Sequence, residues 1–149
     1  MKRPGLTLLL GVMMAACSEP PTIEQLIIAE IRGMEAEIES GKRLNFMSHV
    51  SEDFRGQGGA MGRDELRAYV VLQFNRYKNL EARLFPISVT PISETEANAD
   101  FKALLTGGPG WIPEDGQLYE INTHWRLEDD DWRLVAAYWE PAPLGDLID

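Results

Sequence analysis

Apolar residues recur at helical spacing near the start of the sequence. Together they form one stripe, which predicts a long amphipathic helix over about residues 23–40: Ile23, Ile27, Ile31, Met34 and Ile38. Thr22 and Gln25 form a capping-box pattern before it, and Ser40-Gly41 provides a stop. The same spacing predicts a short second helix within residues 44–50 and a third helix over about 62–78.

After Asn79 the pattern changes to alternation of apolar and polar residues, which is typical of strands. The expected strands cover about residues 80–92, 97–105, 117–127 and 132–140. Pro86 and Pro91 have no N–H to donate, so the first strand must contain a bulge, a bend or an edge. Helices followed by an antiparallel meander define an α+β layout.

The first residues carry an export pattern. A positive start is followed by an apolar run from Leu6 to Ala16, which is too short to span a bilayer. The run ends in Met14-Ala15-Ala16-Cys17, which resembles the lipobox of bacterial lipoprotein precursors. That resemblance implies lipidation of Cys17 after cleavage; the alternative is an ordinary secretory signal with an incidental cysteine. We expect a signal peptide at 1–16, a lipidated tether at 17–21, a domain at 22–140 and a tail at 141–149.

The lipobox resemblance also implies a location. The protein would be anchored in a bacterial cell envelope by its acyl chains and face the periplasm. Ser18 rather than Asp follows the cysteine, and by resemblance to enterobacterial sorting this favours the outer membrane.

Composition narrows the function classes. The chain has 149 residues and a net charge of −10; removing 16 residues, with Lys2 and Arg3 among them, leaves 133 residues and a charge of −12. This length suits one domain with a real core. The acidic balance argues against a nucleic-acid partner and against docking on anionic lipid by charge alone. The single cysteine excludes an intrachain disulfide.

Three stretches resemble the nuclear transport factor 2-like superfamily, which includes ketosteroid isomerases and polyketide cyclases. They are Asp53-Phe54 after the first helices, the meander after Leu80, and the hairpin 125–135 around Glu128-Asp129-Asp130-Asp131. The likeness covers about residues 22–140 and is greatest to envelope lipoproteins of this superfamily. It implies a cone-shaped α+β fold, with N-terminal helices packed on a strongly curved antiparallel sheet of about four strands.

The hairpin also predicts which side chains share a face. If Leu127 lies opposite Trp132, one face carries Tyr119, Trp125, Leu134 and Tyr138, and the other carries Val135, Ala137 and Trp139. Two apolar faces suggest that the outer surface of the sheet is covered as well. Members of the superfamily often pair sheet to sheet, so a homodimer through Val135, Ala137 and Trp139 is our hypothesis.

A ligand cavity is the main candidate for function. Trp111 lies in a Gly/Pro-rich loop, where it would close the mouth of the cone as a plug or a pocket wall. The other expected lining residues are Phe46, Tyr69, Phe74, Trp125 and Tyr138. The alternative is that these aromatic residues simply fill the interior.

Catalysis of the isomerase kind needs a carboxylate base in an apolar pocket and a hydroxyl donor. The best available set is Asp53 with Tyr69, Tyr119 or Tyr138 as donor. Asp53 could equally lie in a solvated loop, and no carboxylate matches the base position of the isomerases. We therefore assign no catalytic residue and keep Asp53 and Tyr119 only as weak candidates.

Other candidate sites favour structural roles. His49 and Asp53 are four residues apart, but two ligands are too few for a metal site. His124 is expected to be a solvated cross-strand partner, and the acidic run 128–131 lacks the spaced ligands of a calcium loop. Residues 55–59 could cradle an anion, although a flexible connector is favoured. We expect no metal and no cofactor.

The sequence thus predicts a lipid-anchored envelope protein whose cone domain binds a small apolar molecule or a protein partner. The alternative is a small pocket enzyme that performs proton transfer on an apolar substrate. The two hypotheses differ in one structural requirement: only the enzyme needs a carboxylate and a hydroxyl donor that face an apolar cavity.

Overall fold

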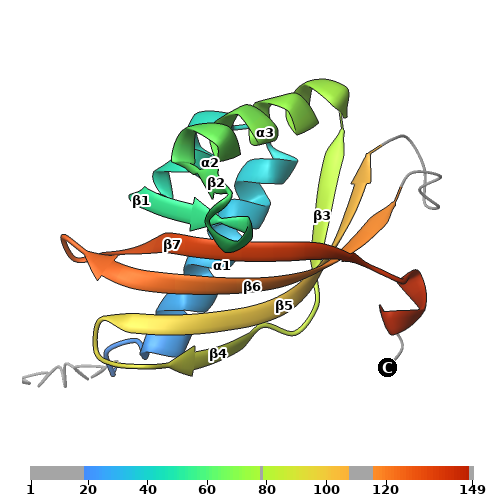
Figure 1. Ribbon diagram of the computed structural model, residues 1–149. Coiled ribbons are helices and arrows are strands. Elements are labelled where there is room, and N and C mark those ends of the chain that lie inside the picture. Colours follow the sequence, from blue (N-terminus) through green and yellow to red (C-terminus); the bar gives the residue numbers. More distant parts are fainter. Residues whose placement is uncertain (1–18, 78, 108–115, 148–149) are drawn as a thin grey trace, which may run out of the picture.

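The computed structural model describes residues 19–77, 79–107 and 116–147 (Figure 1). Helix α1 (Ile23–Glu39) begins at the predicted capping box. The hydroxyl of Thr22 accepts a hydrogen bond from the Gln25 N–H at 3.2 Å, and the Gln25 side chain accepts one from the Thr22 N–H at 3.0 Å. The helix ends at Ser40, and Gly41 follows at φ +68°. The predicted first helix is therefore confirmed.

Two further helices follow, α2 (Arg43–Ser48) and α3 (Arg63–Arg76), both close to their predicted positions. In the part of the chain that the structure describes, no helix is long and apolar enough to cross a membrane.

The strand β1 (Val50–Gly56) was not predicted from the sequence. Its middle is polar, yet Ser51 is only 2% exposed, because its hydroxyl donates to the carboxylate of Glu128 at 2.9 Å. A buried polar residue that is satisfied by a distant partner leaves no alternating pattern to detect. After β1 come a 3₁₀ turn, η1 (Gln57–Gly59), and the short strand β2 (Met61–Gly62).

The predicted strand over 80–92 is divided in two. Strands β3 (Leu80–Leu84) and β4 (Ser88–Pro91) both pair with β5 (Glu96–Gly107), and Pro86 lies in the break between them. The interruption expected from the two prolines is thus confirmed. The remaining strands are β6 (Gln117–Glu128) and β7 (Asp131–Ala142), followed by a 3₁₀ turn, η2 (Leu144–Leu147).

The sheet is larger than the four strands expected. Its seven described strands follow the order β2-β1-β7-β6-β5-β3, with β4 also on β5, and only the β1–β7 pair is parallel. Figure 1 shows the long strands β5, β6 and β7 crossing in front of α1, with α2 and α3 at one side. The α+β cone predicted from the sequence is confirmed: helices pack on a curled, mostly antiparallel sheet.

The β6–β7 hairpin contains one irregularity that changes the face assignment. Leu127 pairs with Trp132 as predicted, and Trp125 pairs with Leu134. The next pair is His124 with Ala136, so Val135 is an extra residue in β7. A one-residue bulge moves every later side chain to the opposite face.

The predicted faces beyond the bulge are therefore wrong. Ala137 and Trp139 were expected on the outer face, but they point inward and line the interior. Tyr138 was expected inside, but it is 47% exposed on the outer face. The hairpin turn itself is as predicted: Asp129 and Asp130 have φ values of 49° and 68°, which a tight two-residue turn requires.

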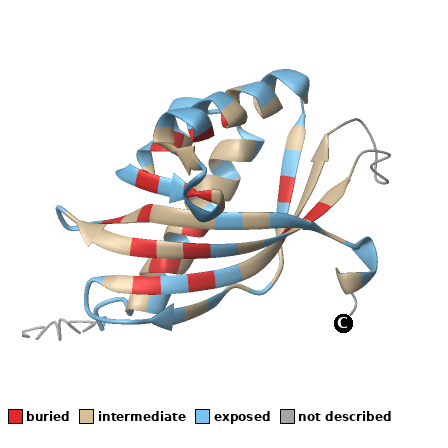
Figure 2. Cartoon of the chain, in the orientation of Figure 1, coloured by how far each residue is buried: buried red, intermediate tan, exposed pale blue. Residues whose placement is uncertain are grey.

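The core lies between the helices and the inner face of the sheet. Figure 2 shows buried positions where these layers meet and exposed positions along the outer side of α3. Its largest fully buried side chains are Trp125, Phe54, Ile27 and Leu118. The small Ala97 and Ala99 on β5, each fully buried, allow close packing at the centre.

Gln57 joins the end of β1 to β7 through its side chain. Its amide nitrogen donates to the Trp139 carbonyl at 3.0 Å, and its amide oxygen accepts from the Trp139 N–H at 3.2 Å. The side chain thus replaces one step of a strand ladder. Gln57 adopts φ +51° to do so, a left-handed conformation that costs a residue other than glycine about 1 kcal/mol.

We predict that Gln57→Ala destabilises the fold by about 1–3 kcal/mol, because both backbone groups of Trp139 lose their partner. Gln57→Gly loses the same bonds but relieves the backbone, and should be about 1 kcal/mol more stable than the alanine variant. Urea unfolding of the three proteins measures this. An alanine variant as stable as the native chain would show that the bridge contributes nothing.

Candidate functional site

The interior of the cone is hollow. Two adjoining hollows, each of about 160 Å³, lie between α1, α3 and the sheet, and we call them together the inner cavity. Six residues line both hollows: Ile38, Phe46, Leu66, Leu105, Ile121 and Trp139. Apart from a few polar groups described below, the walls are aliphatic and aromatic. Such a lining favours small, mostly apolar ligands.

Most of the predicted lining residues are in place. Trp125 lines the first hollow, Tyr69 and Phe74 line the second, and Phe46 lines both. Tyr138 is the exception, because the bulge turns it outward. Trp111 lies outside the described residues.

Three residues with a polar group border the second hollow. Tyr69 and Gln73 reach it from α3, and Tyr119 reaches it from β6. The Tyr69 ring packs against Trp139 with ring centroids 5.9 Å apart. The surface of the second hollow is nevertheless almost wholly apolar, so a ligand there meets mainly the carbon atoms of these side chains.

Tyr119 is present as a neutral hydroxyl at physiological pH. Burial raises its pKa above the ordinary 10.0, and the neighbouring Tyr69 and Tyr77 raise it further. A raised pKa disfavours the phenolate, because a buried charge loses its hydration. A hydrogen bond with the Tyr69 side chain contributes to the same rise in the pKa of Tyr119, so the two hydroxyls are placed to pair with each other.

Glu35 is the carboxylate of the inner cavity, and the sequence reasoning missed it. It lines the first hollow, and its side chain is 16% exposed. Both of its oxygens are engaged: Oε1 accepts from the Leu84 N–H at 3.2 Å, and Oε2 pairs with Arg32 at 2.8 Å. Its position four residues after Ile31 on α1 was the available signal.

The other polar group in the first hollow is already satisfied. The Thr123 hydroxyl donates to the Ala99 carbonyl at 2.8 Å and accepts from the Trp125 ring N–H at 2.9 Å. This buried chain orients the Trp125 ring and leaves the hydroxyl little capacity for a ligand.

Asp53 does not face the inner cavity. It lies on β1, its side chain is 80% exposed, and it contacts Arg126 at 3.2 Å. Arg126 also pairs with Glu128, and these two carboxylates raise the pKa of its guanidinium. The catalytic set that combined Asp53 with a tyrosine donor is therefore wrong, since the carboxylate and the cavity tyrosines lie apart.

His49 and Asp53 do not form a site together, in line with the structural role that the sequence favours. His49 caps α2, whereas Asp53 belongs to β1, so the two do not share a helix face. His49 Nδ1 instead lies 2.6 Å from Glu30 Oε2 on α1. His124 has the cross-strand role expected, 2.7 Å from the Asn98 side chain. Within the described residues, no cluster of three or more His, Cys, Asp or Glu side chains is placed to hold a metal.

The outer face of the sheet is more polar than expected. Asp100 and Asn122 form a hydrogen-bonded pair at 2.8 Å, and Lys102 donates to the Asp146 carbonyl at 2.8 Å. The bulge removes Ala137 and Trp139 from this face and adds Tyr138. The homodimer stays a prediction, but Ala137 and Trp139 are not available on the outer face to form its interface.

No protein-family model matches the chain, and no curated protein is similar to it in sequence. Solved structures are similar in fold. One is Bd1075 of Bdellovibrio bacteriovorus, with a TM-score of 0.68 and 8% identity over 79% of this chain; the chain spans 40% of that protein. Another is a nuclear transport factor 2-like protein of unknown function from Pseudomonas putida, with a TM-score of 0.67 and 15% identity, covering 78% of this chain and 84% of that one.

An enzyme is among the similar structures. The chain aligns with a hexachlorocyclohexane dehydrochlorinase from Novosphingobium barchaimii with a TM-score of 0.66 and 10% identity, over 80% of this chain and 86% of the enzyme. At these identities the likeness establishes the fold alone. The chain has the nuclear transport factor 2-like fold, as its terminal hairpin predicted.

We predict that Tyr119→Phe changes the alkaline stability of the protein. The folded state keeps the Tyr119 proton to a higher pH than the unfolded state, so this residue makes stability fall as pH rises above about 10. The phenylalanine variant should lose stability less steeply from pH 9 to 11. Urea unfolding at several pH values measures this, with Tyr138→Phe on the outer face as the matched control. Equal slopes for Tyr119→Phe and the native chain would contradict the prediction.

Proposed function

We propose that the chain is a lipid-anchored protein of the bacterial cell envelope whose domain binds a small, mostly apolar molecule in the inner cavity without transforming it. The observation that carries this proposal is the cavity wall. Its surface is almost wholly apolar, while its carboxylate, Glu35, is engaged by Arg32 and the Leu84 N–H.

The dimensions of the inner cavity support a ligand of one or two rings. A cavity of about 150 Å³ lined by apolar side chains holds benzene. Each of the two hollows is of that size, and they adjoin at the Phe46, Ile121 and Trp139 side chains. A ligand spanning both would lie beside Trp125 at one end and beside Tyr69 and Tyr119 at the other.

Binding is favoured over proton transfer by the state of Glu35. A general base needs an oxygen lone pair free to approach the substrate. Each carboxylate oxygen of Glu35 already has one partner, Arg32 or the Leu84 N–H, so a substrate proton would compete with these partners for the carboxylate. The dehydrochlorinase has a similar fold and is an enzyme, so catalysis on this fold is the alternative function. Its likeness to this chain does not identify a base here.

The anchor is supported by the sequence before the domain. The apolar run ends at Cys17, and α1 begins only six residues later, at Ile23. Pro20 and Pro21 stiffen this connection. Lipidation at Cys17 would therefore hold the N-terminal end of α1 close to a bilayer, with the outer membrane as the favoured location.

We predict that Ala103→Leu weakens ligand binding while the protein still folds. Ala103 is 2% exposed and lines the first hollow, so three added carbon atoms would occupy the ligand volume. With 2-naphthol as the probe, fluorescence titration should show at least about tenfold weaker binding, equal to 1.4 kcal/mol. Filling an empty cavity should also keep or raise the melting temperature.

The matched control is Ala136→Leu, the same change on the outer face of β7, opposite His124. It should bind 2-naphthol like the native chain. Native mass spectrometry of protein purified from its own envelope then tests for a natural ligand. Equal 2-naphthol affinity in the native chain and in Ala103→Leu would overturn the proposed use of the inner cavity.

We predict that Cys17→Ala moves the protein from the membrane fraction to the soluble fraction. The thiol is the acylation point, and without acyl chains the acidic domain has no strong attraction to lipid. Cell fractionation and immunoblotting measure this, with Ser18→Ala as a control that keeps the cysteine. A Cys17→Ala protein that stays on the membrane would contradict the anchor.

A further inference from the structure

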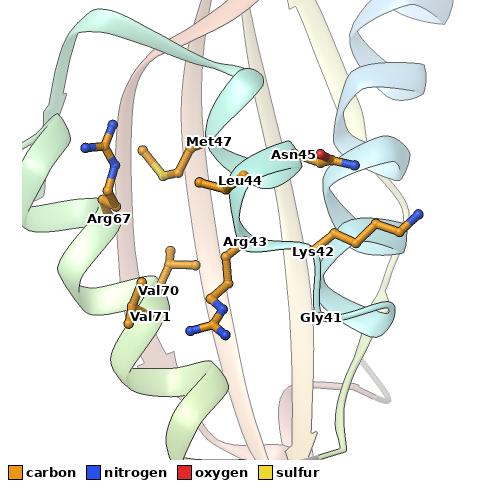
Figure 3. Close-up of a pocket in the computed structure, with 9 residues that line it drawn as sticks. All are labelled: Gly41, Lys42, Arg43, Leu44, Asn45, Met47, Arg67, Val70 and Val71. Atoms are coloured by element: carbon orange, nitrogen blue, oxygen red, sulfur yellow. The ribbon is translucent and has the colours of Figure 1, made fainter.

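A separate pocket lies on the helical side of the molecule, between α2 and α3. Its volume is about 490 Å³, and we call it the arginine pocket (Figure 3). Residues 41–45 and Met47 line it from the α1–α2 region, and Arg67, Val70 and Val71 line it from α3. Of these residues only Val70 also lines the inner cavity, so the two sites are separate.

The arginine pocket has the opposite charge to the rest of the chain. Acidic residues outnumber basic ones by 24 to 14 in the sequence. The described residues that line the pocket nevertheless include Arg43 and Arg67 and no acidic residue. A local cationic site on an acidic protein concentrates anions there and repels them elsewhere.

Neither arginine is neutralised by a strong ion pair. Within the described residues, the Arg43 guanidinium forms no salt bridge, and it donates a hydrogen bond to the side-chain oxygen of Asn75 at 3.3 Å. Arg67 lies 3.5 Å from Asp64, and their side chains are 48% and 88% exposed. Exposed pairs of this kind contribute little, so both guanidiniums keep donors for a bound anion.

The floor between the two arginines is apolar. Figure 3 shows Arg67 and Arg43 toward opposite ends of the pocket, with Leu44, Met47, Val70 and Val71 between them. Lys42 points to the other side of α2, toward α1. Leu44 is 81% exposed, an unusual state for a leucine beside a pocket. The site thus combines an apolar strip with a cationic group at each end.

We propose that the arginine pocket binds a small amphipathic anion, a medium-chain carboxylate being the simplest example. The carboxylate pairs with Arg43 or Arg67, and the aliphatic body covers Leu44 and Val71. This inference does not depend on the inner cavity, and only the choice of a dissolved ligand over a lipid headgroup rests on the proposed anchor.

The position of the pocket favours a dissolved ligand over a lipid headgroup. The tether precedes the N-terminus of α1, whereas the pocket begins at Gly41, just past its C-terminus. The 17 residues of α1 separate these points by about 25 Å at the helical rise of about 1.5 Å per residue. A membrane that holds the N-terminus would therefore lie away from the pocket.

The experiment titrates sodium decanoate into the full chain carrying Cys17→Ala, with calorimetric detection. This parent protein, whose pocket is unchanged, should bind decanoate. The double variant Arg43→Gln/Arg67→Gln should bind it at least tenfold more weakly. Binding should also weaken as salt is raised. Arg83→Gln, which removes an exposed cation from β3, is the matched control and should bind like the parent. Circular dichroism establishes that each variant is folded.

Further measurements distinguish binding at the arginine pocket from binding in the inner cavity or at a lipid surface. Decanol and decyltrimethylammonium test the need for negative charge, and neither should depend on Arg43 or Arg67. Decanoate affinity that falls in Ala103→Leu but not in the double arginine variant would place the ligand in the inner cavity and overturn the proposal. So would arginine-dependent binding to phosphatidylglycerol vesicles without any binding of decanoate, because the partner would then be a lipid surface.

Discussion

One extra residue in β7 determines which side chains reach the interior. Val135 has no partner in β6, so the alternation of β7 reverses between Leu134 and Ala137. Because of this reversal, Leu134 near the hairpin and Trp139 near the far end both face the helices. The bulge also increases the local bend of the strand, and a bent sheet can wrap around α1. A regular hairpin would instead turn Trp139 outward and leave the inner cavity without one of its walls.

The elements that were predictable from the sequence are those whose burial follows a simple period. The α1 stripe, the inward side of β5 and the Leu127–Trp132 pair all follow from local spacing. The face of β7 beyond Val135 was not predictable in this way, because a bulge is a property of two strands together. Strand β1 was hidden for a similar reason: Ser51 is buried through a partner 77 positions away.

The residues of the candidate site also divide into those predictable from local spacing and those set by tertiary contacts. Phe46, Tyr69, Phe74 and Trp125 were found because large aromatic residues on predicted inner faces have few other places to go. Glu35 was missed because a charged residue on an amphipathic helix is normally assigned to solvent. In the structure its carboxylate binds the backbone of β3 at Leu84, which allows it to lie at the edge of the apolar hollow. Only tertiary contacts could reveal that compensation.

The inner cavity and the arginine pocket differ in the charge of the side chains that line them. Among the described residues that line the inner cavity, the one carboxylate is paired with Arg32, and the remaining polar groups, such as Tyr119, are neutral. A charged ligand there would lose hydration without gaining a partner ion. In the arginine pocket the guanidiniums of Arg43 and Arg67 remain open to solvent and to anions. A neutral apolar molecule is therefore suited to the first site and an amphipathic anion to the second, so occupancy of one need not compete with occupancy of the other.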